Sequence, residues 1–98
     1  MTEGKKYDTG KPRWSLIPKG VMCHVIKTLM TGADKYGDYN WQSVTPFKER
    51  YYNAMKRHID KWWEKGEVID PDDGIPHLAH VICCAMFLMW GDDNIKEK

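Results

Sequence analysis

Apolar residues recur at helical spacing in three stretches of the chain. In the first stretch, four of them follow one another at four-residue intervals: Val21, Val25, Leu29 and Ala33. This spacing places them on one face of a helix. We expect that helix to span about residues 20–36, because Gly37 is a natural C-terminal stop.

The second apolar pattern lies between Thr45 and Gly66. Its apolar face comprises Tyr52, Met55, Ile59, Trp62 and Trp63. Thr45 is typical of an N-cap, and Pro46 is typical of a first helical residue. We therefore expect a helix over about residues 46–65, which Gly66 ends.

The third pattern predicts a helix over about residues 76–90, between Pro76 and Gly91. After His80 this helix is apolar on every side, and two other helices cannot easily cover it. We expect a homo-oligomer, a dimer or a tetramer, in which it lies at the centre of a shared bundle. The alternative is a monomer in which the N-terminal segment completes the cover. The apolar run Val81–Trp90 is shorter than the roughly 20 residues that cross a bilayer, so no membrane span is expected.

The N-terminal segment differs in character from the helices. Residues 1–19 contain two glycines and two prolines, which favour an extended arm. Trp14, Leu16 and Ile17 within this arm predict that it packs against something. With a polar tail at residues 92–98, the chain is expected to form a single all-α domain over residues 1–98. This is a three-helix unit with an extended N-terminal arm, which assembles into an oligomeric helical bundle.

Composition narrows the class of partner. Lys and Arg (15) nearly balance Asp and Glu (14), for a net charge of +1. The chain therefore lacks the basic face of a protein that binds duplex DNA. The polar N-terminus has no apolar core of a signal peptide, and three cysteines, two of them adjacent, do not suggest a disulfide framework. These features predict a cytoplasmic protein.

Two histidines open the third predicted helix. His77 and His80 are three residues apart, so they lie on the same face of its first turn. They could bind a divalent metal, or phosphates at the helix N-terminus; the alternative is two polar residues in a solvent-exposed first turn. Asp70, Asp72 and Asp73 could add oxygen ligands for magnesium or manganese, or could only form a turn and cap the helix.

Other side chains suit a phosphate or a base. Arg57, next to His58, could fork onto a phosphate, or could belong to a solvated basic face. Further cations lie near flexible or turn segments: Lys11, Arg13 and Lys35. Trp41, beside Asn40, could stack on a base, or could fill a gap in the core.

Four motifs in a fixed order carry a resemblance to a known family. They are KYDTGKPRWSLIP, TGADKYGDYNW, RHIDKWW and IDPDDGIPHLAH, and they span about residues 6–90. In this order they resemble the N-terminal domain of the dATP/dGTP diphosphohydrolases of phages and bacteria. That family is in turn similar to the MazG-like all-α nucleoside triphosphate pyrophosphohydrolases.

The MazG-like resemblance implies a fold and a metal site. Those proteins are dimeric or tetrameric helical bundles that use magnesium to cleave a nucleoside triphosphate to the monophosphate and pyrophosphate. Their metal ligands are a glutamate cluster, EExxE, on one helix and ExxD at the start of the next. Here His77 and His80 take the two acidic positions of ExxD, and Glu49 is the only acid where the cluster would fall. The resemblance implies Mg²⁺ or Mn²⁺, with the ligands Glu49, Asp73, His77 and His80.

The resemblance also implies a function: binding of purine deoxynucleoside triphosphates and their hydrolysis to monophosphate and pyrophosphate, in the host cytoplasm if the chain is phage-encoded. The residues expected to act in catalysis are His58, His77 and His80. The residues expected to contact the nucleotide are Lys11, Arg13, Lys35, Asn40, Trp41 and Arg57. Two alternatives stay open: a non-catalytic binder of nucleotides or nucleotide signals, and a structural or protein-interaction helical module.

Overall fold

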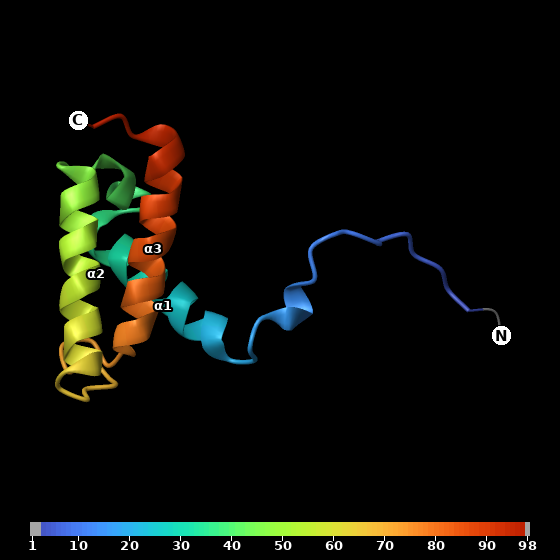
Figure 1. The fold of residues 1–98 in the computed structure, drawn as a ribbon, viewed down its shortest axis with the longest axis horizontal. Helices are drawn as coiled ribbons and strands as arrows, with labels where there is room; N and C mark the ends of the chain where they lie inside the picture. The colour runs from blue at the N-terminus through green and yellow to red at the C-terminus, as the bar shows by residue number, and fades with distance from the viewer. Residues whose placement is uncertain (1–2, 98) are drawn as a thin grey trace.

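Three α-helices make up the body of the protein. In the computed structural model, which describes residues 3–97, they are α1 (Val21–Tyr36), α2 (Phe47–Trp63) and α3 (His77–Asn94) (Figure 1). Two short 3-10 helices, η1 (Trp14–Leu16) and η2 (Asn40–Ser43), precede α1 and α2. Residues 3–97 contain no strand, and the predicted all-α class is confirmed. No helix in this range is long and apolar enough to cross a membrane.

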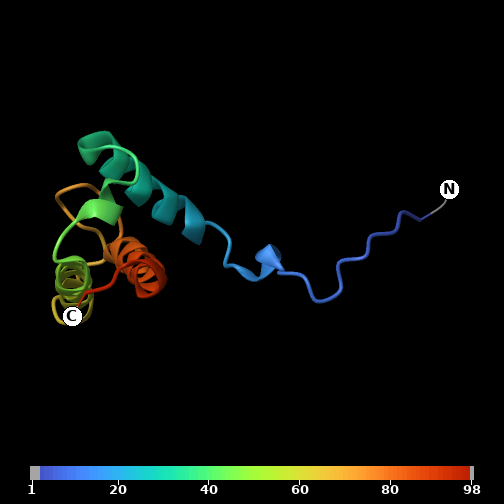
Figure 2. The same ribbon diagram turned by 90° about the horizontal axis from the view of Figure 1, so that it is seen from above.

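Helix α3 is the centre of the packing. It runs antiparallel to α2 along its whole length, and α1 crosses it obliquely on another side (Figures 1 and 2). The buried apolar residues come from all three helices and from the loop before α3: Val25, Phe47, Ile75, Ala79, Cys83 and Cys84. This core fixes the first turn of α3 against α2, where the predicted histidines lie.

The end of α3 differs from the prediction. Gly91 was the expected stop, but α3 continues to Asn94. A Cβ atom at position 91 would clash with Cε1 of the buried Phe47 ring. Gly91 is therefore a packing residue, whose missing side chain lets the phenyl ring approach the helix backbone. The first three residues of the expected polar tail at 92–98 are helical.

The start of α2 also differs from the prediction. Pro46 occupies the N-cap position, and no side chain within this segment caps the helix. Instead, the carboxylate of Glu97 accepts hydrogen bonds from the backbone N–H groups of Phe47 (2.7 Å) and Lys48 (3.0 Å). These two bonds lower the pKa of Glu97. The end of the chain thus supplies the cap that Thr45 was expected to supply, because an anion is stabilised at a helix N-terminus.

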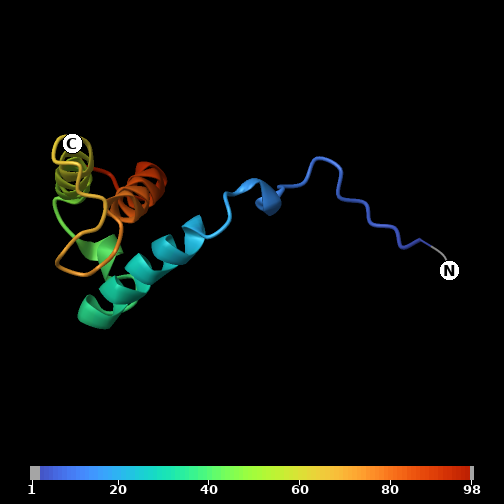
Figure 3. The same cartoon turned by 90° about the horizontal axis from the view of Figure 1, so that it is seen from below.

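The N-terminal arm extends away from the helices (Figures 2 and 3). Trp14 is 75% exposed and Leu16 is 68% exposed, so the arm finds no packing partner within the described chain, residues 3–97. The alternative of a monomer whose arm completes the cover of α3 is therefore wrong. The arm leaves the body at the start of α1, which directs it away from α2 and α3. The surface of α3 keeps exposed apolar side chains, among them Leu78, Met86 and Met89.

Candidate functional site

A group of imidazoles and carboxylates gathers where the loop after α2 returns to α3. We call it the histidine–carboxylate cluster, and its members are His58, Glu67, Asp70, Asp73, His77 and His80. His58 comes from α2, and His77 and His80 come from the first turn of α3. The three acids come from the loop between these helices. Residues far apart in the sequence therefore meet at one end of the helix pair.

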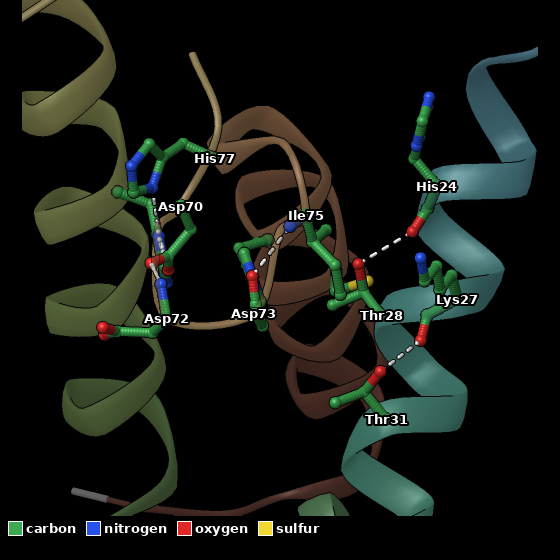
Figure 4. Close-up of polar contacts among 12 residues, drawn as sticks. His24, Lys27, Thr28, Thr31, Asp70, Asp72, Asp73, Ile75 and His77 are labelled. Carbon is green, nitrogen blue, oxygen red and sulfur yellow. Dashed lines mark hydrogen bonds and ion pairs between the residues drawn. The ribbon is translucent and has the colours of Figure 1, made fainter. Parts of the chain in front are cut away.

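The loop is held in place by its own aspartates (Figure 4). Asp70 Oδ1 accepts the backbone N–H of Asp72, and Asp73 Oδ1 accepts the backbone N–H of Ile75, each at 2.9 Å. Gly74 follows with a φ of 72°, which a side chain would disfavour. The turn-forming alternative is confirmed for Asp70 and Asp73, whereas no side chain caps α3. Each of the two aspartates uses one oxygen for the turn, which leaves its second oxygen for the histidines.

The histidines contact the acids and one another. Glu67 Oε1 accepts the Nε2–H of His77 at 2.7 Å, and Asp73 Oδ2 accepts the Nε2–H of His80 at 2.8 Å. The Nδ1 atoms of His58 and His77 lie 2.9 Å apart. The rings of His58 and His80 stack with their centroids 4.3 Å apart and their planes 7° from parallel. This is a connected network and not a set of separate polar residues.

Burial sets the charge of the cluster. His77 is fully buried, so a solvent-exposed first turn is wrong for this residue. Burial, together with the nearby His80 and His77, lowers the pKa of His58 to about 4, so His58 is neutral at neutral pH. Burial alone would raise the pKa of Asp70, but the N–H of Asp72 and the neighbouring imidazoles lower it overall. The cluster thus combines a neutral His58 with an ionised, buried Asp70.

A cavity of about 750 Å³ opens beside the cluster. His58, His80 and Asp73 line it on one side. Four of the residues predicted to contact a nucleotide also line it: Lys35, Asn40, Trp41 and Arg57. The structure therefore brings most of the predicted site residues around one space. Arg50 and Tyr51 line the same cavity and escaped the sequence analysis, since both lie in a stretch where only the acid was considered.

Three predicted residues do not join this site. Lys11 and Arg13 lie in the exposed arm, which extends away from the helices (Figure 1). Glu49 is exposed in the first turn of α2. It precedes His58 by nine residues on the same helix, which corresponds to roughly 13 Å along the axis. The structure therefore does not bring Glu49 to the histidines, because the rise of the helix separates them, and the metal role of Glu49 stays a prediction.

Trp41 has a structural role. Its ring stacks on Phe87, with centroids 4.3 Å apart and planes 13° from parallel, and meets Trp90 edge-on at 4.9 Å. The hydroxyl of Tyr51 donates a hydrogen bond to the backbone carbonyl of Trp41 at 3.1 Å. The predicted gap-filling role is confirmed, and contact between Trp41 and a base stays a prediction.

Glu67 is a member of the cluster that sequence analysis missed. It lies ten residues before His77, across a loop, and no regular spacing connects two positions in that way. The return of the chain is what brings them together, through the hydrogen bond of His77 N–H to the Val68 carbonyl at 2.9 Å. The only feature of the sequence that could have indicated Glu67 is that the loop contains one more acidic residue.

The donor atoms do not match a carboxylate-only magnesium site. Two groups within residues 3–97 place three ligand atoms within 4.8 Å of one another, namely His58, Asp70 and His77, and Asp70, Asp73 and His80. Both groups contain imidazole, whereas magnesium prefers oxygen ligands. Both groups therefore suit a transition-metal ion better than magnesium.

Comparisons with known proteins identify the family. The family model described as dATP/dGTP diphosphohydrolase, N-terminal, matches residues 1–98. A dATP/dGTP diphosphohydrolase of Salmonella phage PMBT28 is 38% identical over 87 residues, which cover 89% of this chain and 29% of that relative. The chain thus spans less than a third of this relative's length, and no solved structure matches significantly. The chain belongs to the family of dATP/dGTP diphosphohydrolase N-terminal domains.

Proposed function

We propose that this chain binds a purine deoxynucleoside triphosphate in the cavity and hydrolyses it to the monophosphate and pyrophosphate. The observation that carries this proposal is that Arg57 and the His80–Asp73 pair open onto one cavity. Its volume of about 750 Å³ lies in the ordinary range for small-molecule sites. The name of the phage relative agrees with this substrate class.

The proposed chemistry needs a base and a cationic clamp. His80 donates its Nε2–H to Asp73, so its Nδ1 keeps a lone pair that can accept a proton from water. The water oxygen attacks the α-phosphorus, the bond from that phosphorus to the bridging oxygen breaks, and pyrophosphate leaves. Arg57, with Arg50 and Lys35, neutralises the phosphate charge. Asp73 positions His80 and does not itself react.

Replacement of Arg57 by methionine tests the clamp. We expect the affinity for dGTP to fall by about 10- to 100-fold, because a hydrogen bond to a charged group is worth roughly 1.5–3 kcal/mol. Isothermal titration calorimetry measures this loss. Lys56→Met is the matched control, since Lys56 is the exposed neighbour that pairs with Asp60 at 3.3 Å and does not line the cavity. Equal affinities for the two variants would contradict the proposed clamp.

The alternative function, binding of a nucleotide without hydrolysis, is supported by how little of the phage relative this chain covers. The chain covers 29% of the phage relative, so most of that protein lies outside the similarity. Incubation with each of the four deoxynucleoside triphosphates and a divalent metal, followed by anion-exchange chromatography, separates the two functions. Release of dGMP or dAMP with pyrophosphate supports hydrolysis. Stoichiometric retention of intact triphosphate would support a binder.

The proposed assembly is a homo-oligomer of this chain. The single chain exposes 8267 Å², whereas a compact protein of 11.5 kDa exposes roughly 5,800 Å². The difference exceeds the roughly 800 Å² that each partner buries in a standard interface. We propose that a second copy seated on α3 and the arm covers part of this excess, since Met89 on α3 is 69% exposed.

Met89→Glu is expected to dissociate this assembly into monomers, because a buried unpaired charge is strongly disfavoured. Light scattering coupled to gel filtration measures the mass. Asn53→Glu, which adds the same charge at an exposed polar position of α2, should leave the mass unchanged. A wild-type protein that is monomeric at all concentrations would exclude the assembly.

A further inference from the structure

Three ligand atoms of the cluster lie close together, and in two of the three residues, Asp70 and His77, the other polar atom is already hydrogen-bonded. Asp70 Oδ1 accepts a hydrogen bond from the backbone N–H of Asp72, and Asp70 Oδ2 lies 3.9 Å from His58 Nδ1. His77 gives its Nε2–H to Glu67, which leaves the lone pair of its Nδ1. His58 Nδ1 lies at hydrogen-bond distance, 2.9 Å, from that Nδ1, and a metal ion would take the place of the proton between the two nitrogens. Two ring nitrogens and one carboxylate oxygen thus converge.

The separation of the two nitrogens suits a shared cation. Metal–nitrogen bonds of about 2.1 Å at a right angle place the two nitrogens about 3.0 Å apart. All three ligand atoms of His58, Asp70 and His77 lie within 4.8 Å of one another. We propose that these three residues bind one divalent transition-metal ion, of the class of Mn²⁺, Fe²⁺, Co²⁺ and Zn²⁺. Its action on a nucleotide rests on the proposed function, whereas the binding of the metal does not.

The surrounding residues are arranged as a supporting shell. A carboxylate that accepts the second N–H of a histidine ligand fixes its tautomer and its orientation, and Glu67 does this for the fully buried His77. The ring of His80 stacks on the ring of His58, and both residues line the cavity. His80 is thus a neighbour of the metal site that faces the cavity.

The second group, Asp70, Asp73 and His80, is less suited to hold the ion. Asp73 has already committed one oxygen to the N–H of Ile75 and the other to His80. Two imidazoles and one carboxylate are a ligand set typical of transition metals with open coordination positions. Magnesium, which prefers oxygen ligands, is therefore expected to bind more weakly than cobalt or zinc.

Titration of the metal-free protein without nucleotide tests this proposal. We expect one equivalent of Co²⁺ or Zn²⁺ to bind at least about 100-fold more tightly than Mg²⁺ in calorimetry. Asp70→Asn should weaken Co²⁺ binding by about 100-fold or more. Even the mutation of a residue that only supports a metal ligand lowers metal affinity by about 10- to 100-fold. Asp72→Asn, in the same turn but exposed, and His24→Ala, the one histidine outside the cluster, should retain wild-type affinity.

A second variant guards against a folding defect. His58 is less buried than Asp70, so His58→Asn should keep the helical circular dichroism spectrum and still lose Co²⁺ affinity. Wild-type Co²⁺ affinity in His58→Asn, or Mg²⁺ binding as tight as that of Co²⁺, would overturn the proposal. If dGTP binding that depends on Arg57 persists in that case, only the metal inference fails. If metal binds as expected but dGTP does not bind, only the proposed function fails.

Discussion

Replacement of His80 by alanine is expected to slow the conversion of dGTP to dGMP by about 100- to 10,000-fold, the ordinary contribution of a general base. The reason is the hydrogen bond of His80 Nε2–H to Asp73 at 2.8 Å, which leaves Nδ1 as the proton acceptor beside the cavity. The affinity for dGTP should change much less, because Arg57 and the other cations remain. Steady-state rates from chromatography of the products, with binding measured by calorimetry, separate the two effects.

His24→Ala is the matched control for this variant. His24 is exposed on α1 and lies outside both the cluster and the cavity, so its removal should leave the rate unchanged. A wild-type rate for His80→Ala would show that another group accepts the proton. An equal loss in His24→Ala would point to a general effect on the fold.

Gly91→Ala is expected to have the largest effect on stability. The Cβ atom of the alanine would clash with Cε1 of Phe47, a ring that is only 1% exposed and is packed against Tyr51 and Trp90. Overpacking of this kind costs about 1–3 kcal/mol. A loss of about 2 kcal/mol corresponds to a fall in Tm of roughly 8–16 °C for a chain of this size. Thermal unfolding followed by circular dichroism measures this shift.

Gly32→Ala is expected to change the stability in the opposite direction. Gly32 lies inside α1, and a Cβ there would meet nothing within 4 Å. Alanine favours a helix over glycine by about 0.5–1 kcal/mol, so this variant should be more stable than the wild type. A stabilised Gly91→Ala protein would contradict the close packing of Phe47 on α3.

Periodicity predicted the helices well where one face is apolar and where the glycine after the helix makes no packing contact of its own. The structure places α1 and α2 within two residues of the predicted ranges. The end of α3 could not be predicted in this way, because Gly91 serves a contact with Phe47, a residue far away in the sequence. Likewise, no local pattern indicates that Glu97 caps α2 from the other end of the chain.

The candidate site was predictable where neighbours on a helix carry it. His77 and His80 lie on one face of the first turn of α3, as their spacing requires. The pairing of His77 with Glu67 depends on how the loop returns, which the sequence does not encode locally. The resemblance implied that Glu49 is a metal ligand, but Glu49 lies in the first turn of α2, far along the helix axis from His58. The sequence could not show whether Lys11 lies near the site, because glycines and prolines predict an extended backbone but not the direction in which it runs.

A crystal structure of the chain with a non-hydrolysable dGTP analogue and Co²⁺ most directly tests whether the cavity is a nucleotide site. We expect the triphosphate between Arg57 and His80, inside the cavity of about 750 Å³, and anomalous density between His58, His77 and Asp70. Saturating analogue that leaves the cavity empty, or that binds only at the arm around Lys11 and Arg13, would contradict the proposed nucleotide site.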